Sequence, residues 1–159
     1  MYTEEQIKEL VQCPKTIVDP PKKINEGRES FFKKAFTLSS IDGNYHFNGF
    51  ITQNLTFPEN FSIGLSYNPK DEKGSIVLLR CNGPHGGIKN IPHHASCHIH
   101  SATAERINNG LKPEGEIELT EDYATIETAI HFFLKKINLI TKDIKKNFPT
   151  PTIDNRLDL

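Results

Sequence analysis

The sequence lacks tryptophan entirely and has only one methionine among its 159 residues. Its three cysteines, Cys13, Cys81 and Cys97, are too few and odd in number for the disulfide framework of a small secreted protein. No apolar run approaches the roughly 20 residues that span a bilayer, and the first residues lack the basic start and apolar stretch of a secretion signal. We therefore expect a cytoplasmic protein with no membrane contact.

The sequence also lacks a strong net charge, because 19 basic residues against 20 acidic ones leave a formal charge of −1. A general attraction to nucleic acid is therefore absent, and such contact would need a local basic patch. An acidic stretch, Glu114–Asp122, balances two basic patches, and ordinary solvated surface is the alternative explanation for each of them. The basic patches consist of Lys22, Lys23, Arg28, Lys33 and Lys34, and of Lys135, Lys136, Lys142, Lys145 and Lys146.

The hydrophobic pattern predicts a single α+β domain that contains an antiparallel meander of about five strands. Alternating or continuous apolar runs separated by turn signals predict the strands, and short connections require neighbouring strands to pair antiparallel. The expected strands are 30–40, 45–54, 61–67, 75–81 and 95–102. Asp19-Pro20-Pro21 is expected to be an extended connector outside the interior of the sheet, because proline lacks the backbone donor.

Two helices are expected to accompany this sheet. Thr3–Val11 has a capping threonine and an i, i+3, i+4 apolar stripe, which predict a short N-terminal helix. Thr120–Leu139 has acidic residues at its start, a longer apolar stripe and lysines near its end, which predict one long C-terminal helix packed on one face of the sheet. The single domain is expected to cover residues 1–146, and residues 147–159 to form an extended or disordered tail.

The chemically unusual feature is a segment that holds five of the seven histidines within sixteen residues: His85, His93, His94, His98 and His100. Residues two apart on a strand share a face, so His98 and His100 are expected to point one way and Cys97 and Ile99 into the core. The preceding strand ends near Arg80. If the two strands pair, the intervening loop brings Arg80, His85, His93 or His94, and His98 toward one place.

Several chemistries fit such a cluster. In metal-free cleavage of a phosphodiester, His85 and His98 would be the acid–base pair, Arg80 would hold the phosphate, and His93, His94 or His100 would be alternates. In a metal site, His98 and His100 would be two ligands and the loop would supply a third. The histidines are also explained as a pH sensor, a plain binding surface or hydrogen-bonded loop anchors.

The motifs in this segment resemble those of the TumE family of bacterial toxin–antitoxin systems, or of a related phage or mobile-element family. The resemblance rests on the run Leu79-Arg80-Cys81-Asn82-Gly83-Pro84-His85, followed by Pro92-His93-His94 and a closing His98 or His100. It implies a small α+β toxin that acts on RNA and is held by an antitoxin partner.

We therefore expect a small intracellular toxin-like protein that acts on RNA through a histidine-rich site. It would be a metal-independent ribonuclease, without a cofactor or a bound metal, and its partner would be RNA or a protein. The alternative is a non-enzymatic phage or mobile-element protein that inhibits a host defence protein through Glu114–Asp122 or the C-terminal tail. A metal-dependent hydrolase is the third hypothesis. The sequence does not predict an oligomeric state.

Overall fold

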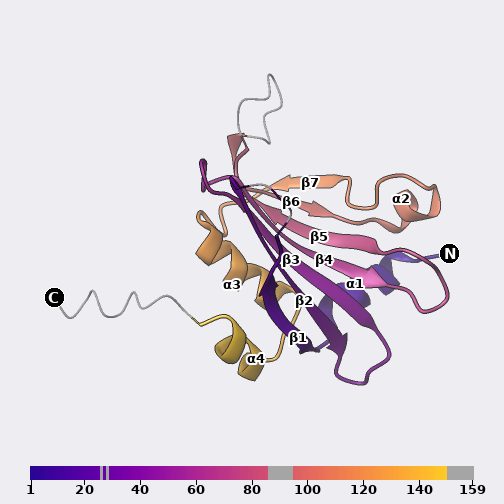
Figure 1. Cartoon of the computed structure of the whole chain (residues 1–159). Coiled ribbons are helices and arrows are strands. Elements are labelled where there is room, and N and C mark those ends of the chain that lie inside the picture. The colour runs from indigo at the N-terminus through magenta and orange to yellow at the C-terminus, as the bar shows by residue number, and fades with distance from the viewer. Residues whose placement is uncertain (26, 28, 86–94, 150–159) are drawn as a thin grey trace.

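The computed structural model describes residues 1–25, 27, 29–85 and 95–149. Among them, seven strands form one antiparallel sheet in which the spatial order of the strands equals their order along the chain (Figure 1). The strands are β1 (Lys15–Lys23), β2 (Phe31–Ser40), β3 (His46–Asn54), β4 (Phe61–Asn68), β5 (Ile76–Asn82), β6 (His98–Ser101) and β7 (Glu116–Leu119). The helices are α1 (Glu4–Gln12), α2 (Ala104–Asn108), α3 (Ile126–Lys136) and α4 (Thr141–Asn147).

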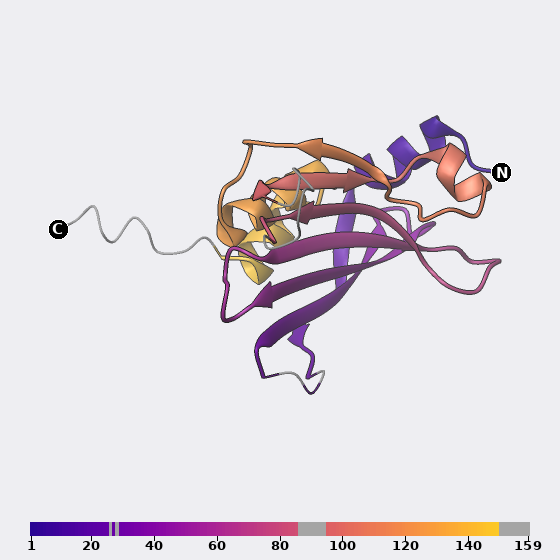
Figure 2. The ribbon, with the colours of Figure 1, turned by 90° about the horizontal axis from the view of Figure 1, so that it is seen from above.

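The two faces of the sheet differ in character because side chains alternate along each strand. Helices α1, α3 and α4 cover one side, which we call the helix face (Figures 1 and 2). Its apolar side chains form the core with those of α3, including Phe36, Leu38, Phe47, Ile63, Leu65, Cys81, Ile99, Phe133 and Leu134. The opposite side, the polar face, carries in register Thr37, Asn48, Phe50, Thr52, Ser62, Gly64, Ser66, Arg80, Asn82, His98 and His100.

The five predicted strands are confirmed as β2 to β6, but the sheet is larger than expected by one strand at each edge. Asp19-Pro20-Pro21 is extended and outside the interior of the sheet, as expected, but it belongs to the edge strand β1 and is not a connector. The pairing of β1 with β2 shifts register on both sides of Asp19, and an edge strand tolerates these prolines because its outer side needs no partner. At the other edge, β7 has only four residues, all of them exposed.

The short N-terminal helix is confirmed, whereas the single long C-terminal helix is wrong. Thr3 caps α1 by accepting from the backbone N–H of Gln6. Helix α3 has only 11 residues, and its capping residue is Thr125, inside the expected range and not at its start. It ends where Asn138 takes a φ of 61°, the left-handed conformation that commonly follows a helix, and α4 is a separate element. None of the helices in the described part of the chain is long and apolar enough to cross a membrane.

Helix α4 also occupies the start of the expected tail. Asn147 is its last residue, and the side chain of Phe148 is buried with its ring edge-on to Phe36, at a centroid distance of 5.3 Å. The remaining residues of that prediction, 150–159, lie outside the described residues.

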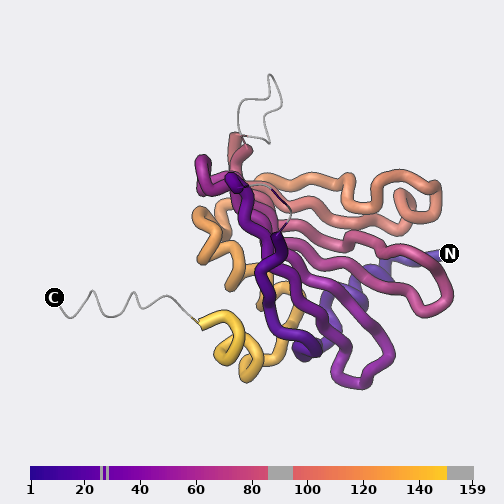
Figure 3. Tube along the Cα trace, in the orientation of Figure 1, coloured from indigo at the N-terminus to yellow at the C-terminus, as the bar shows by residue number. Residues whose placement is uncertain are grey.

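One buried lysine joins the two ends of the fold. The Lys15 ammonium donates to the carbonyl oxygens of Val11 at 2.7 Å, Cys13 at 2.9 Å and Ile137 at 2.9 Å. The backbone of Lys15 also bonds Asn138 and Ile140, which brings the start of β1 beside the chain that leads into α4 (Figure 3). Burial lowers the pKa of Lys15 to about 8, so the side chain is still charged at neutral pH. All three ammonium protons therefore have acceptors at the C-terminal ends of two helices.

Candidate functional site

The register between β5 and β6 brings the predicted arginine and two of the histidines together on the polar face. Arg80 lies opposite His100, and Asn82 lies opposite His98. Ile99 and Cys97 are 6% and 9% exposed and belong to the core cluster. The predicted alternation of this segment is therefore confirmed.

Three imidazole rings follow one another from the surface inward. The Nε2 atoms of His85 and His98 are 3.3 Å apart, and their ring centroids are 5.1 Å apart. The ring of His100 follows at 5.0 Å from that of His98. His85 is partly exposed, whereas His98 is 0% exposed and His100 is 8% exposed. The sequence prediction that His85 and His98 approach each other is confirmed.

The hydrogen bonds of His98 assign where the protons of the pair lie. His98 Nδ1 is 2.9 Å from the carbonyl oxygen of Ser96, which can only accept, so Nδ1 carries the proton. A neutral His98 then presents a lone pair on Nε2, and His85 donates to it from its own Nε2. In a neutral His85 ring the basic lone pair is consequently on Nδ1. A backbone carbonyl thus fixes one ring, and that ring fixes the next.

His100 is the last ring of the three, and it stays neutral near neutral pH. Its Nδ1 lies 3.3 Å from the carbonyl oxygen of Glu114. Burial, followed by the positive charge of Arg80, lowers its pKa to about 4. His98 and His100 point away from the core residues Cys97 and Ile99, as expected, yet both side chains are buried. Alternation along a strand predicts which residues share a face but not whether that face is exposed to solvent.

The phosphate-binding candidate, Arg80, is held by a partner that the sequence did not indicate. Arg80 Nε donates to Glu114 Oε2 at 3.0 Å, and the two side chains are 19% and 6% exposed. Because this ion pair uses Nε, it is the terminal nitrogens of the guanidinium that are oriented for a further acceptor. Glu114 had been grouped with the acidic surface stretch, and no local signal distinguishes it, because its partner is 34 residues away.

A tyrosine also fixes the strand ends that carry the site. The Tyr123 hydroxyl donates toward two carbonyl oxygens, those of Asn82 at 2.8 Å and His98 at 2.9 Å. Ser62 donates to the side-chain oxygen of Asn82 at 2.6 Å. Tyr123 is 4% exposed and had been placed within the predicted long helix. Tyr123 therefore joins the end of β5 to the start of β6, which begins at His98.

Two of the predicted site residues, His93 and His94, lie outside the described residues. Within the described ranges, no group of three or more His, Cys, Asp or Glu side chains is arranged to hold a metal ion. The three cysteines are free thiols, and Cys81 and Cys97 are buried on the helix face.

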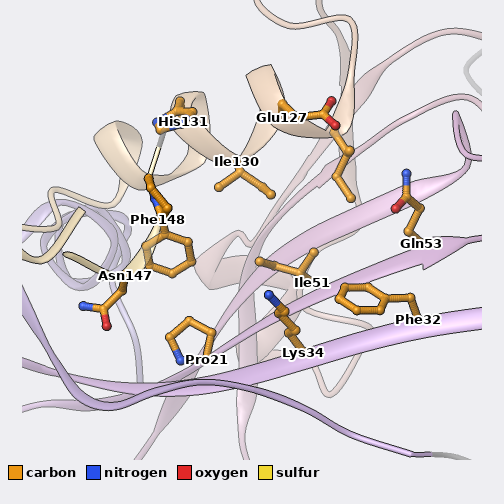
Figure 4. A pocket seen from close by; sticks show the side chains of 12 residues that line it. Pro21, Phe32, Lys34, Ile51, Gln53, Glu127, Ile130, His131, Asn147 and Phe148 are labelled. Carbon is orange, nitrogen blue, oxygen red and sulfur yellow. The ribbon is translucent and has the colours of Figure 1, made fainter. Parts of the chain in front are cut away.

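A separate cavity of about 280 Å³ lies on the helix face, between α3, the end of α4 and strands β1 to β3 (Figure 4). Its polar groups are Lys34, Gln53, Glu127, His131 and Asn147, set around apolar walls. The cavity shares no residue with His85, His98 and His100, which we call the histidine row and which lie on the other face of the sheet. The histidine row is the better candidate for chemistry because two of its imidazoles are already in hydrogen-bonding contact.

No family model, curated protein or solved structure matches this chain. The geometry of the histidine row and the motifs in the sequence are therefore the observations from which a function can be inferred.

Proposed function

We propose that the protein is a small toxin-like ribonuclease that needs no metal, with His85 as the group that exchanges protons with RNA. The observation that carries the proposal is the contact between His85 and His98, 3.3 Å between Nε2 atoms. It runs from a partly exposed ring to a fully buried one. Such an arrangement is typical of an oriented general base, in which an inner group fixes the tautomer of an outer one.

The two histidines act as one unit and not as a separate base and acid. An in-line displacement at phosphorus needs proton transfer at two oxygens on opposite sides of the phosphate. Two nitrogens in mutual contact cannot reach both oxygens, and His98 has no exposed surface with which to touch a substrate. His85 is therefore the catalytic residue and His98 is a positioning residue, which revises the acid–base pair expected from the sequence.

The proposed reaction is the attack of a ribose 2′-oxygen on the neighbouring phosphate. His85 Nδ1 accepts the proton of the 2′-hydroxyl as the bond from O2′ to phosphorus forms and the bond from phosphorus to O5′ breaks. The leaving oxygen takes a proton from a second acid, for which His93 and His94 remain the sequence candidates. The products are a 2′,3′-cyclic phosphate and a 5′-hydroxyl. Arg80, oriented by Glu114, donates to the phosphate oxygens as their charge develops.

The first test uses a fluorescent single-stranded RNA and the purified protein in the presence of EDTA. We expect cleavage to persist with the chelator, and His85→Ala to lower the rate by at least about a hundredfold, which is the usual contribution of a general base. His46→Ala is the matched control, because His46 is exposed on β3 and lies outside the histidine row. Loss of activity with EDTA and its return with zinc or manganese would instead support the metal hypothesis.

A second pair of variants tests the positioning role of His98. The amide of asparagine reaches about as far as Nδ1 of histidine, and the amide of glutamine about as far as Nε2. His98→Asn therefore keeps a donor for the Ser96 carbonyl, whereas His98→Gln keeps an acceptor for His85. We expect kcat to fall further in His98→Asn than in His98→Gln, with KM unchanged and a shifted pH profile. Equal losses that follow the melting temperature would indicate a purely structural histidine.

Expression in bacteria separates the enzyme from its main alternative. The enzyme hypothesis expects slowed growth that His85→Ala relieves. A specific observation favours the alternative, a protein that binds a host factor: Ile117 and Leu119 are 39% and 56% exposed on the edge strand β7, within the predicted acidic contact stretch. If the wild-type protein is harmless and does not cleave RNA, this edge is where its partner should be sought.

A further inference from the structure

A second feature of the polar face is a basic cleft at the end of the sheet opposite β7. A hollow of about 660 Å³ lies over β1 to β4, and Lys22, Lys23 and Lys33 are among the residues that line it. The carboxylate that lines it, Asp19, accepts from the hydroxyl of Thr37 at 3.0 Å. Three lysines against one carboxylate make the cleft locally positive in a protein whose net charge is −1. Such a local patch attracts phosphates where the whole chain does not.

An aromatic ring lies at the inner border of this cleft. Phe50 lines it and is partly exposed, and its ring lies directly on the backbone of the next strand at Gly64. A Cβ atom at Gly64 would be 2.0 Å from Phe50 Cζ, so this position accepts the ring only because it is a glycine. The ring therefore extends from β3 over β4, in the direction of β5. A partly exposed phenylalanine beside lysines is the usual platform on which single-stranded nucleic acids stack a base.

The register connects this platform with the histidine row. Lys22, Ala35, Phe50, Gly64, Arg80 and His100 are successive partners across six neighbouring strands. With strands about 4.8 Å apart, Phe50 is about 10 Å and Lys22 about 19 Å from Arg80 along this row. Basic groups, an aromatic ring and the proposed phosphate-binding arginine thus lie in one line on one face, within the reach of a few nucleotides.

We infer that single-stranded RNA crosses the polar face along this row, with its phosphates on Lys22 and Lys23, one base stacked on Phe50 and the scissile phosphate at Arg80 and His85. The inference rests on the proposed function, since it supplies the substrate class and the binding track of the same site. A single strand fits better than a duplex, because stacking on Phe50 needs a base that has left its own stack.

The test measures the affinity for a short fluorescein-labelled oligouridylate by anisotropy, in a His85→Ala background so that the probe stays intact. We expect Phe50→Leu to weaken binding about tenfold, as the loss of one stacked base does, and Phe50→Tyr to preserve it. The double variant Lys22→Gln with Lys23→Gln should reduce the slope of log affinity against log salt concentration. The reduction should correspond to the loss of up to about two phosphate contacts. The matched control is Lys142→Gln with Lys145→Gln, both exposed on α4, and it should change nothing.

Two outcomes overturn the inference: equal affinity in Phe50→Leu and Phe50→Tyr, or equal loss from both lysine pairs. Cleavage by the otherwise wild-type protein distinguishes this failure from that of the proposed function. Metal-free cleavage whose KM is unaffected by the Phe50 and Lys22–Lys23 changes would leave the proposed function standing and refute the track. Binding with the expected dependence but without cleavage would support the track and refute the ribonuclease.

Discussion

Replacing Lys15 by methionine should destabilise the protein strongly, although a lysine-to-methionine change is harmless on most surfaces. Lys15 is 0% exposed, and its ammonium donates to three carbonyl oxygens, those of Val11, Cys13 and Ile137. Hydrogen bonds from a charged donor contribute about 1.5–3 kcal/mol each, or roughly 5–9 kcal/mol for three. Methionine also removes the cost of burying the charge, which offsets several kcal/mol. We therefore expect the free energy of unfolding to fall by about 3–5 kcal/mol.

Urea denaturation followed by circular dichroism measures this change, with Lys142→Met as the control. Lys142 is exposed on α4, so its replacement should shift the free energy of unfolding by less than about 0.5 kcal/mol. The denaturant slope should stay the same in both variants, because neither changes the surface exposed on unfolding. If Lys15→Met lost no more stability than Lys142→Met, the three carbonyl contacts would contribute nothing and the reasoning would fail.

Two further predictions concern stability. Phe133 is 0% exposed in α3, so Phe133→Ala should cost about 3–5 kcal/mol in a urea melt, and a loss within experimental error would show that α3 does not pack on the sheet as described. The pKa of His100 is lowered from 6.5 to about 4, so between these pH values the unfolded chain binds a proton that the folded one does not. Stability should therefore be complete above pH 6.5 and decrease as the pH falls toward 4, by about 2–3 kcal/mol. The same melts on His100→Gln should show a weaker pH dependence, and an unchanged one would assign the effect to other groups.

Much of the sheet was predictable because each inner strand has an alternating apolar pattern that can be recognised from its own residues. Phe47 and Ile51 on β3 are separated by an even number of residues, as are Ile63 and Leu65 on β4. Each pair therefore lies on one face of its strand, and all four side chains are buried on the helix face. The edge strands could not be recognised in the same way. β7 alternates glutamate with Ile117 and Leu119, yet all four of its residues are exposed. It is a strand because it pairs with β6, and this pairing has no signal in the residues of β7 themselves.

The length of the C-terminal helix was mispredicted for a tertiary reason. The apolar stripe continues through Ile137 and Leu139, but both residues are buried beside Lys15, whose backbone bonds Asn138 and Ile140. These contacts come from the other end of the chain, and they favour the left-handed turn at Asn138 over another helical turn. Periodicity identified the residues that face the core but not where the helix ends.

For the site, the sequence predicted which groups meet but not their surroundings. The alternation of His98 and His100 and the pairing with Arg80 follow from strand geometry. Their burial, and the roles of Glu114 and Tyr123, depend on contacts 14 to 41 residues distant along the chain. These contacts changed the expected chemistry, because a buried His98 has no exposed surface for a substrate and a His100 with a pKa of about 4 stays neutral.

The strand order has a consequence for how the chain folds as it is synthesised. Each strand after β1 pairs with the one made just before it, so β2 to β5 can assemble hairpin by hairpin with only short loops to close. Lys15 is made early, but its acceptor Ile137 and its backbone partners Asn138 and Ile140 are made late. The apolar face of the nascent sheet is therefore not covered until α3 has been synthesised. During that interval the exposed face is where a chaperone would bind, and a chain truncated before α3, at Ile126, would remain in that state.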